Sequence, residues 1–423
     1  MIDIIKLLKE NKEIKDYKIN TAKTESYELF FVHESLETVR CTDTENTTVT
    51  VYSEHDGKIG HASFKLYAST SEDEARAKIA KAQKQAALIS NEYYTLPADE
   101  TFDGEIPSNF ANYDAKTLAY KIQDAVFSAD TFDLGSINAL EVCVNKHTVS
   151  VRNSRGIDKC ERKYSAMVEA IPTWNEGESV ELYEAKRFNS FDFDDIKDEI
   201  EAKMREVRDR GRATPPAEKL SCPILLGTHE IASLMRNITG NLDYAGVYAH
   251  MNPYSIGDKI QKNLTGDPVS ITMRGQLEGS VASALFDGDG TSLTDTEIVR
   301  NGEVVSYFGS HRFAQYLDMK PTGALPCTEL ATGTLTDEEL RKALYFECVS
   351  MSGLQVDILN DYIGGEVRLA YYFDGEKKIP MTGISISGKL SEALDSIRLS
   401  DEAKCAGSYK GPKYALLFGI EII

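Results

Sequence analysis

The chain changes character near residue 214, where the segment "RATPPAEKLS" contains Pro215-Pro216. Paired prolines are typical of loops between folded units, because each proline locks φ and lacks an N–H donor. Residues before this point alternate between strand and helix patterns, whereas residues after it form short apolar runs separated by glycine turns. A single hydrophobic core usually serves about 100–200 residues. We therefore predict two domains, 1–213 and 214–423.

The first domain is predicted to be an α/β domain in which strands followed by a helix occur twice, a pseudo-duplicated arrangement. In the first round, Asp56-Gly57 separates two β-rich runs, which is typical of a hairpin. Ser71 and Glu74 then have the spacing of a capping box at a helix start. The second round has its own helix, a strand meander and a long charged helix. Residues 92–113 contain two prolines and little periodicity, which predicts a linker or long loop.

The second domain, 214–423, is predicted to be mostly β after one helix over about residues 229–239. Asn301-Gly302 lies between two apolar runs, as hairpin turns do. Many short strands with few helices are typical of a sandwich or of a barrel-like sheet. The fold class expected for the whole chain is therefore α+β, with an α/β-type first domain and a barrel- or sandwich-like second domain.

The composition argues against several classes of function. A formal net charge of −20 opposes nucleic-acid binding, because phosphates are recognised by basic surfaces. No run of about 18 apolar residues is present, and the first 20 residues carry charges within their apolar pattern, so neither a membrane span nor a signal peptide is expected. The seven cysteines are scattered and include no Cys-x-x-Cys, which favours free thiols in a reducing compartment. We expect a cytoplasmic protein.

Three stretches of the chain resemble the TldD/PmbA (TldE) family. They are residues 34–52, "ESLETVRCTDTENTTVTVY"; residues 284–323, which begin "ALFDGDGTSLTDTE" and end "LDMKPTG"; and residues 365–397, "GEVRLAYYFDGEKKIPMTGISISGKLSEALDSI". Each motif alone is a modest match, and the resemblance depends mainly on the three motifs occurring in the same order as in the family. The resemblance implies an α/β N-terminal domain followed by a barrel-like C-terminal domain.

The resemblance also implies an activity. TldD-like members resemble zinc peptidases, in which a His-Glu-x-x-x-His helix opens the second domain and a cysteine near the C-terminus completes the metal site. TldD pairs with TldE/PmbA, and the pair trims unfolded polypeptides and the leader peptides of modified bacterial peptides. TldE-like members lack the metal motif and serve as the partner subunit.

The stretch "GTHEIASLMRNI", residues 227–238, carries part of this zinc motif. A catalytic zinc needs about three protein ligands and a water, with two ligands about a helical turn apart and a glutamate that takes the proton from the water. By resemblance, His229 would be the first ligand and Glu230 a vestigial general base. The second ligand position of the family is Leu234, and the shorter spacing of other zinc peptidases gives Ser233. Neither side chain binds zinc as imidazole does.

An ordinary helix start explains the same residues. Thr228 would be the N-cap, and Glu230 in the first turn would complement the helix dipole. Cys405, in "SDEAKCAGSYKGP", stands where the resemblance places the family's cysteine. A surviving metal site formed by His229, Cys405 and a third ligand is therefore the alternative to the helix start.

Other candidate residues have structural explanations. The spacing of His250 and His311 in the sequence gives no reason to expect either of them beside His229 in one metal site. The turn at residues 286–290, "FDGDG", lacks the alternating carboxylates of a calcium loop. Its Gly288 and Gly290 are expected to allow positive φ angles.

We therefore predict the TldE/PmbA-like partner subunit of a TldD-like zinc peptidase. The isolated chain is expected to be inactive and to hold no cofactor, with the zinc in the partner subunit. Its partners would be that subunit or a second copy, and an extended or unfolded peptide bound by strand addition; no contact with nucleic acid or membrane is expected. Two alternatives stay open: an autonomous metallopeptidase with a divergent metal site, and a non-enzymatic homodimeric regulator, since PmbA-like proteins are linked by name to modulation of DNA gyrase.

Overall fold

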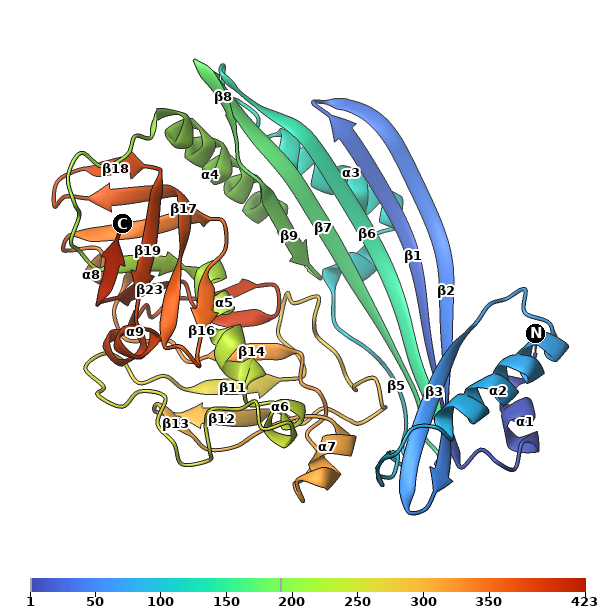
Figure 1. The fold of residues 1–423 in the computed structure, drawn as a ribbon. Coiled ribbons are helices and arrows are strands. Elements are labelled where there is room, and N and C mark those ends of the chain that lie inside the picture. The colour runs from blue at the N-terminus through green and yellow to red at the C-terminus, as the bar shows by residue number, and fades with distance from the viewer. Residues whose placement is uncertain (1, 191) are drawn as a thin grey trace.

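The first half of the molecule is built on one large sheet of long, mostly antiparallel strands (Figure 1). The computed structural model describes residues 2–190 and 192–423. In this part of the chain the strand order is β4-β3-β2-β1-β6-β7-β5, and β8 and β9 also pair with β7. The strands are β1 (Asp16–Val32), β2 (Ser35–His55), β3 (Lys58–Leu66), β4 (Asn91–Glu92), β5 (Thr101–Glu105), β6 (Gly135–Asn153), β7 (Asp158–Glu176), β8 (Glu178–Glu181) and β9 (Glu184–Phe188).

Two rounds of helix, strands and helix meet at the centre of this sheet. The first round consists of α1, β1–β3 and α2, and the second of α3, β6, β7, β9 and α4. β1 and β6 pair antiparallel from Lys18↔Asn153 to Val32↔Ala139, so the two rounds share one continuous sheet. The helices are α1 (Ile4–Glu10), α2 (Glu72–Ala86), α3 (Ala115–Phe127) and α4 (Phe193–Arg212).

Alternation along the long strands buries one face of the sheet and leaves the other polar. Leu29 and Val142 lie on the buried face, where they join apolar residues of the helices, such as Ile122 of α3, in one core. Successive residues of a strand point to opposite faces. Glu28 and Cys143, which pair across β1 and β6, therefore lie on the opposite face, which we call the open face.

Two local sequence signals in this half form the structures they predict. Asp56 and Gly57 connect β2 to β3 with φ angles of 48° and 70°, as a hairpin of this type requires. The Ser71 and Glu74 side chains each accept a backbone N–H at the start of α2, which is the reciprocal arrangement of a capping box. Both predictions are confirmed.

The segment 92–113 contains more regular structure than its sequence revealed. β5 pairs in parallel with β7, from Thr101↔Asp158 to Glu105↔Arg162, and a 3-10 turn follows at Asn109–Asn112. The β5 residues alternate poorly and are mostly exposed, because β5 is an edge strand. Such a strand has no apolar face to bury and leaves little periodicity in the sequence.

The second half contains two open sheets, and neither closes into a barrel within the described residues. The barrel-like form of the prediction is therefore not realised, whereas the α+β fold class is confirmed. One sheet has the order β20-β23-β10-β15-β17-β19-β24, with β16 and β18 paired to β17, and the other has the order β13-β12-β11-β14-β22-β21. The strands are β10 (Ile224–Gly227), β11 (Ile271–Arg274), β12 (Thr296–Arg300), β13 (Glu303–Val304), β14 (Cys327–Leu330), β15 (Tyr345–Met351), β16 (Gln355–Asp357), β17 (Tyr362–Phe373), β18 (Lys378–Met381), β19 (Ile384–Gly388), β20 (Arg398–Leu399), β21 (Ala403–Ala406), β22 (Tyr409–Pro412), β23 (Tyr414–Leu417) and β24 (Ile420–Ile422).

Helix α5 (Thr228–Gly240) lies between these two sheets (Figure 1). Its apolar side chains, among them Ile231, Leu234 and Met235, are completely buried in a core to which both sheets contribute. The other helices of this half are short: α6 (Tyr244–Tyr248), α7 (His311–Tyr316), α8 (Asp337–Leu340) and α9 (Leu390–Ser396). Among the helices described, none combines the length and the apolar character needed to cross a bilayer.

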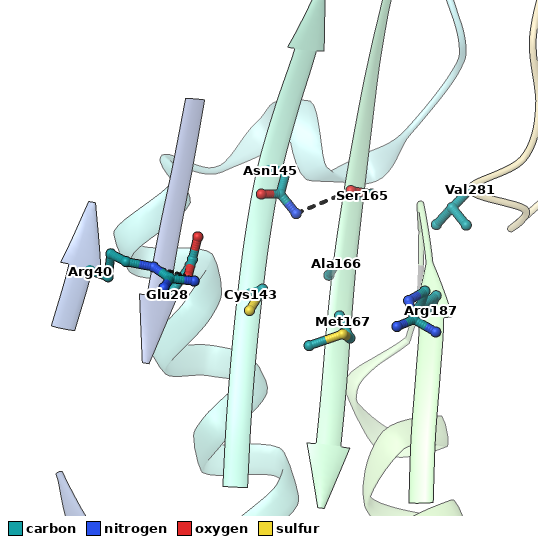
Figure 2. A pocket seen from close by; sticks show the side chains of 9 residues that line it. All are labelled: Glu28, Arg40, Cys143, Asn145, Ser165, Ala166, Met167, Arg187 and Val281. Carbon is teal, nitrogen blue, oxygen red and sulfur yellow. Dashed lines mark hydrogen bonds and ion pairs between the residues drawn. The ribbon is translucent and has the colours of Figure 1, made fainter. Parts of the chain in front are cut away.

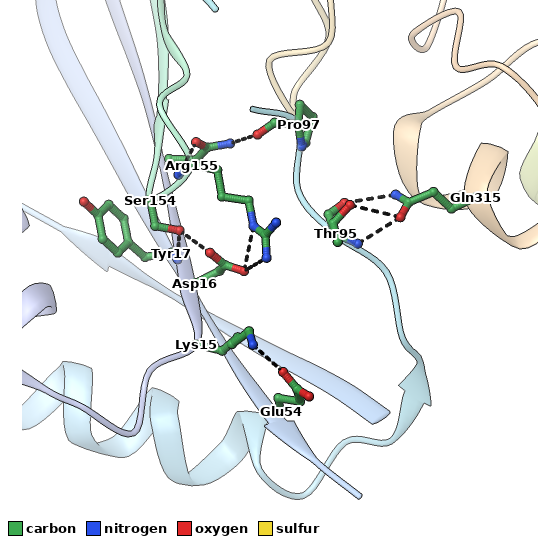
Figure 3. Close-up of polar contacts among 10 residues, drawn as sticks. Lys15, Asp16, Tyr17, Glu54, Thr95, Pro97, Ser154, Arg155 and Gln315 are labelled. Carbon is green, nitrogen blue, oxygen red and sulfur yellow. Dashed lines mark hydrogen bonds and ion pairs between the residues drawn. The ribbon is translucent and has the colours of Figure 1, made fainter. Parts of the chain in front are cut away.

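The two halves contact each other at several places, and two of these contacts involve helices. At one, α4 packs against β17 and β18, and Val207 of α4 shares a small core with Trp174 of β7 and Leu369 of β17. At the other, α7 meets the segment that follows β4: the Thr95 backbone N–H donates to Gln315 Oε1 at 3.0 Å, and Gln315 Nε2 donates to the Thr95 carbonyl at 3.0 Å (Figure 3). The junction at α4 places the first half beside the start of α5.

Candidate functional site

The site begins at the N-terminus of α5, which follows β10 directly. Gly227 is the N-cap and gives no side-chain hydrogen bond. Thr228, predicted as the N-cap, is instead the first helical residue, and that prediction is wrong. Its hydroxyl donates to the Lys413 carbonyl at 3.1 Å, so the side chain is already engaged with a distant strand connection.

His229 and Glu230 lie where α5 faces the first half of the molecule. His229 keeps an accessible surface, but the surrounding protein desolvates its imidazole and lowers its pKa, with Glu184 acting in the opposite direction. Glu230 is half-buried, and desolvation raises the pKa of its carboxyl to about 7. Lys203 opposes this rise and Glu206 adds to it, so both residues of α4 lie close enough to act on the Glu230 charge.

Lys203 is the central cation of this region. Its Nζ lies 3.1 Å from Glu184 Oε2 of β9 and 2.7 Å from Glu206 Oε2 of α4. Desolvation alone would lower the pKa of Lys203, but the two carboxylates outweigh it and raise that pKa above its usual value. Burial raises the pKa of Glu206. The ammonium group therefore holds together carboxylates that would otherwise repel one another.

A second set of ion pairs extends the region along α4. Glu199 Oε1 lies 3.3 Å from Nζ of Lys404, which belongs to β21, and Glu199 Oε2 lies 2.5 Å from Nζ of Lys186, which belongs to β9. We call the whole group the junction cluster; its members are Glu184, Lys186, Glu199, Lys203, Glu206, His229, Glu230 and Lys404. The cluster links β9 and α4 of the first half to α5 and β21 of the second.

The junction cluster does not fit a catalytic zinc. Leu234, at the family's second ligand position, is fully buried in the apolar core and lies away from the cluster. The cations Lys203 and Lys404 act on His229 from nearby, and a positive neighbour opposes metal binding. Across residues 2–190 and 192–423, no group of three or more His, Cys, Asp and Glu side chains is placed to hold a metal ion.

Within the described residues, Cys405, His250 and His311 belong to no group of three or more side chains that could hold a metal ion. Strand β21 packs against α5, but the exposed Cys405 at its centre directs its thiol to the Glu278 carbonyl, at 3.5 Å. His250 is an exposed loop residue with a φ angle of 55°. His311 starts α7, where the charges that act on it are those of Asp287, Asp289 and Arg155.

The "FDGDG" turn joins the two halves of the molecule. Asp287 is buried, and its carboxylate accepts backbone N–H groups of Asp289, Thr291 and Ala324 at 2.9, 3.0 and 3.1 Å. These bonds occupy the carboxylate with backbone donors of the turn and of the distant residue Ala324. Gly290 has the expected positive φ, 86°, whereas Gly288 does not have a positive φ, so the prediction is correct only for Gly290.

A hollow on the open face of the large sheet is a further candidate site (Figure 2). Its volume is about 290 Å³, and it opens between the strands and the loop that carries Val281. Arg40 and Glu28 form an ion pair at one end, and Arg187 of β9 lies at the other. The lining residues are Glu28, Arg40, Cys143, Asn145, Ser165, Ala166, Met167, Arg187 and Val281.

Sequence reasoning missed the α4 members of the junction cluster. Their signal was present: Glu199, Lys203 and Glu206 recur at spacings of four and three beside the apolar stripe of the charged helix. Charged residues beside the apolar stripe of a helix lie at the edge of the surface that the helix buries. Glu199, Lys203 and Glu206 were therefore candidates for a charged network.

Glu230 provides a testable pH dependence. Its folded pKa of about 7 lies above the ordinary glutamate pKa of 4.5, so the folded protein binds the extra proton and the free energy of unfolding falls as pH rises from about 4.5 to 7. We expect Glu230→Gln to be more stable than the native chain at pH 8 by about 1–3 kcal/mol, and the two to converge near pH 4.5. Urea unfolding at both pH values measures this. The exposed Glu218→Gln is the control; equal stability of Glu230→Gln and native protein at pH 8 would contradict the expectation.

Residues 219–422 match the family model described as the PmbA/TldA metallopeptidase C-terminal domain. This part of the chain is therefore a domain of the TldD/PmbA family, and the resemblance seen in the sequence is confirmed. No curated protein matches the chain in sequence.

Three solved structures share the fold over nearly the whole chain. TldE from Thermococcus kodakarensis has a TM-score of 0.81 at 14% identity, with 99% of each chain covered. A candidate modulator of a DNA gyrase from Thermotoga maritima has a TM-score of 0.78 at 15% identity, covering 99% of this chain and 98% of that one. A candidate modulator of DNA gyrase from Bacteroides thetaiotaomicron has a TM-score of 0.77 at 13% identity, covering 99% and 97%. At these identities the likeness is one of fold.

Proposed function

We propose that this chain is the TldE/PmbA-like partner subunit of a TldD-like zinc peptidase that processes unfolded or leader peptides. The isolated chain cleaves nothing, and the zinc belongs to the other subunit. In the pair, this chain supplies a structural half of the enzyme and a surface that admits extended polypeptide.

The observation that carries the proposal is the position of Leu234. A zinc helix needs a second ligand about one turn beyond the first, on the same side. Here that position is an apolar side chain with no exposed surface, in a core shared by two sheets. Lys203 and Lys404 place positive charge around the one remaining imidazole, His229. Family membership and a fold shared with a TldE support the proposal from a second direction.

Reconstitution tests the proposal. This chain and a TldD-like subunit with an intact His-Glu-x-x-x-His motif, taken from the same genome, are purified alone and together. Each preparation is assayed for cleavage of unfolded casein and for zinc content by mass spectrometry. We expect no cleavage and less than 0.1 zinc per chain (an order-of-magnitude limit for an absent site) for this chain alone, and about tenfold or more stimulation of the TldD-like subunit on mixing.

Two results would overturn the proposal. Stoichiometric zinc with chelator-sensitive cleavage by this chain alone would establish an autonomous peptidase. The proposal also fails if the TldD-like subunit does not bind this chain and cleaves casein at the same rate with and without it. His229→Ala is the matched variant, because only the autonomous peptidase would lose activity through it.

A further inference from the structure

The strand edge formed by the first part of β2 has no partner. Along Ser35–Asn46, β2 pairs with β1 on one side only, from Ser35↔Val32 to Asn46↔Ala22. On the other side β3 begins its pairing at Thr47↔Leu66. Figure 1 shows this part of β2 at the margin of the sheet. We call residues 35–46 the free edge.

The free edge is long and accessible. All of its residues are exposed except the half-buried Thr42. Twelve residues at about 3.3 Å each give an edge of about 40 Å with outward-facing N–H and C=O groups. Proteins usually shorten, twist or cover such an edge, because it is a template for another strand. In the described residues neither a helix nor a loop covers it.

An added strand would also extend the apolar side of the sheet. Val39 pairs with Leu29, so both point to the helix side of the sheet. Leu29 is completely buried, whereas Val39 is 43% exposed. Helix α3 packs on β6 and β1, and α2 packs on the part of β2 that contains Val49 and Val51. A neighbouring strand with a β-branched residue opposite Val39 would cover part of this surface.

The charges of the free edge indicate what kind of strand it accepts. Asp43 and Glu45 are separated from Val39 by even numbers of residues and point to the same face as Val39, whereas Glu37 is the extra residue where the pairing of β1 with β2 shifts register. Glu37 and Glu45 form no ion pair within the described residues, and Asp43 has only Lys23, at 3.5 Å. The single cation of the edge, Arg40, is already paired with Glu28. The unsatisfied charge is therefore negative.

A second copy of the chain is a poor occupant of this edge. If the free edges of two copies pair antiparallel about a twofold axis, the acidic side chains of both copies lie on the same face of the joined sheet. Such pairing brings the acidic side chains of both copies, Asp43 and Glu45 with the Glu37 bulge between them, close together, and like charges close to one another are destabilising. Each chain also carries a formal net charge of −20.

We infer that the free edge binds an extended, cationic polypeptide segment by strand addition, with lysine or arginine side chains on alternate residues facing Asp43 and Glu45 and with Glu37 adding negative charge at the bulge. Main-chain hydrogen bonds provide affinity for any extended sequence, and the acidic row selects basic segments. The inference deepens the proposed function, on which it rests, by giving unfolded polypeptide a place to bind on this subunit.

The test is direct binding of synthetic peptides to the isolated full chain, so it does not depend on any peptidase partner. The probe is a fluorescent 12-residue peptide of alternating lysine and threonine, and hydrogen–deuterium exchange locates its position. We expect binding that weakens with salt and new protection of amides in residues 35–46. The same peptide with glutamate in place of lysine should bind at least about tenfold more weakly.

Matched variants separate strand addition from general attraction. Glu37→Lys/Glu45→Lys should weaken lysine-peptide binding about tenfold, whereas Glu303→Lys/Glu376→Lys, with the same change of charge far from the edge, should leave it within about twofold. Equal binding of a lysine peptide that is N-methylated at consecutive central residues would show attraction without backbone pairing and overturn the inference. A stable dimer of the native chain with residues 35–46 already protected would overturn it in favour of a second copy. If reconstituted peptidase activity appears while the edge binds no peptide, this inference fails and the proposed function stands.

Discussion

Leu234→His is expected to destabilise the protein strongly without creating a zinc site. The substitution restores the letters of the His-Glu-x-x-x-His motif, but the Leu234 side chain points into the core between the two sheets of the second half. There the imidazole loses the packing of leucine and finds no hydrogen-bond partner. We expect the free energy of unfolding to fall by about 3–5 kcal/mol, measured by urea denaturation. Zinc content of the purified variant should stay far below one per chain.

Two variants of the same helix control for this result. Leu234→Met keeps the volume and apolar character of the side chain and should cost less than about 1.5 kcal/mol. Ser233→His adds an imidazole at a half-buried neighbouring position and should cost less than Leu234→His. If Leu234→His binds one zinc per chain and keeps native stability, then α5 presents position 234 to the junction cluster and the proposed function loses its main support.

Local chemistry made several elements of the fold predictable from the sequence. The Asp56-Gly57 hairpin and the α2 capping box depend only on residues within a few positions of each other, so their sequence patterns identify them. The pairing of β1 with β6 joins residues more than a hundred positions apart, and many strands of similar composition could compete for that place. The edge strand β5 buries no apolar face, so its sequence carried no periodic signal.

The site was predictable only in part, for a related reason. The apolar spacing around Leu234 correctly indicated a core helix, because burial and helical periodicity are visible in the sequence. Thr228 was misassigned because its hydroxyl bonds to Lys413, which is distant in the chain but close in the fold. The ion pair of Lys203 with Glu184 brings together separate elements, α4 and β9, in the same way. Tertiary contacts of this kind follow from topology, which local patterns do not specify.

Lys203→Met is expected to be the most damaging substitution in the junction cluster. It keeps most of the side-chain volume but removes the ammonium group that lies 3.1 Å from Glu184 and 2.7 Å from Glu206. The three side chains retain only 17%, 22% and 23% exposure, so water replaces the lost cation poorly. Removing one partner of a largely buried ion pair leaves uncompensated charge, and we expect a loss of about 2–4 kcal/mol at pH 8.

The pH dependence of this loss separates charge from packing. Burial already raises the pKa values of Glu206 and Glu230, and Lys203 opposes both rises. Without Lys203 the pKa values of both carboxyl groups rise further. Above about pH 4.5 the folded variant then keeps protons that the unfolded chain has already lost, so the free energy of unfolding of the variant falls as pH rises. The deficit relative to the native chain should therefore be larger at pH 8 than at pH 5, measured by urea unfolding. Lys203→Arg keeps the charge and Lys219→Met removes an exposed one, and both should stay within about 1 kcal/mol of the native chain. A deficit for Lys203→Met that is the same at both pH values would mean that Lys203 stabilises the junction through its alkyl chain, and that its charge has no part in holding the carboxylates together.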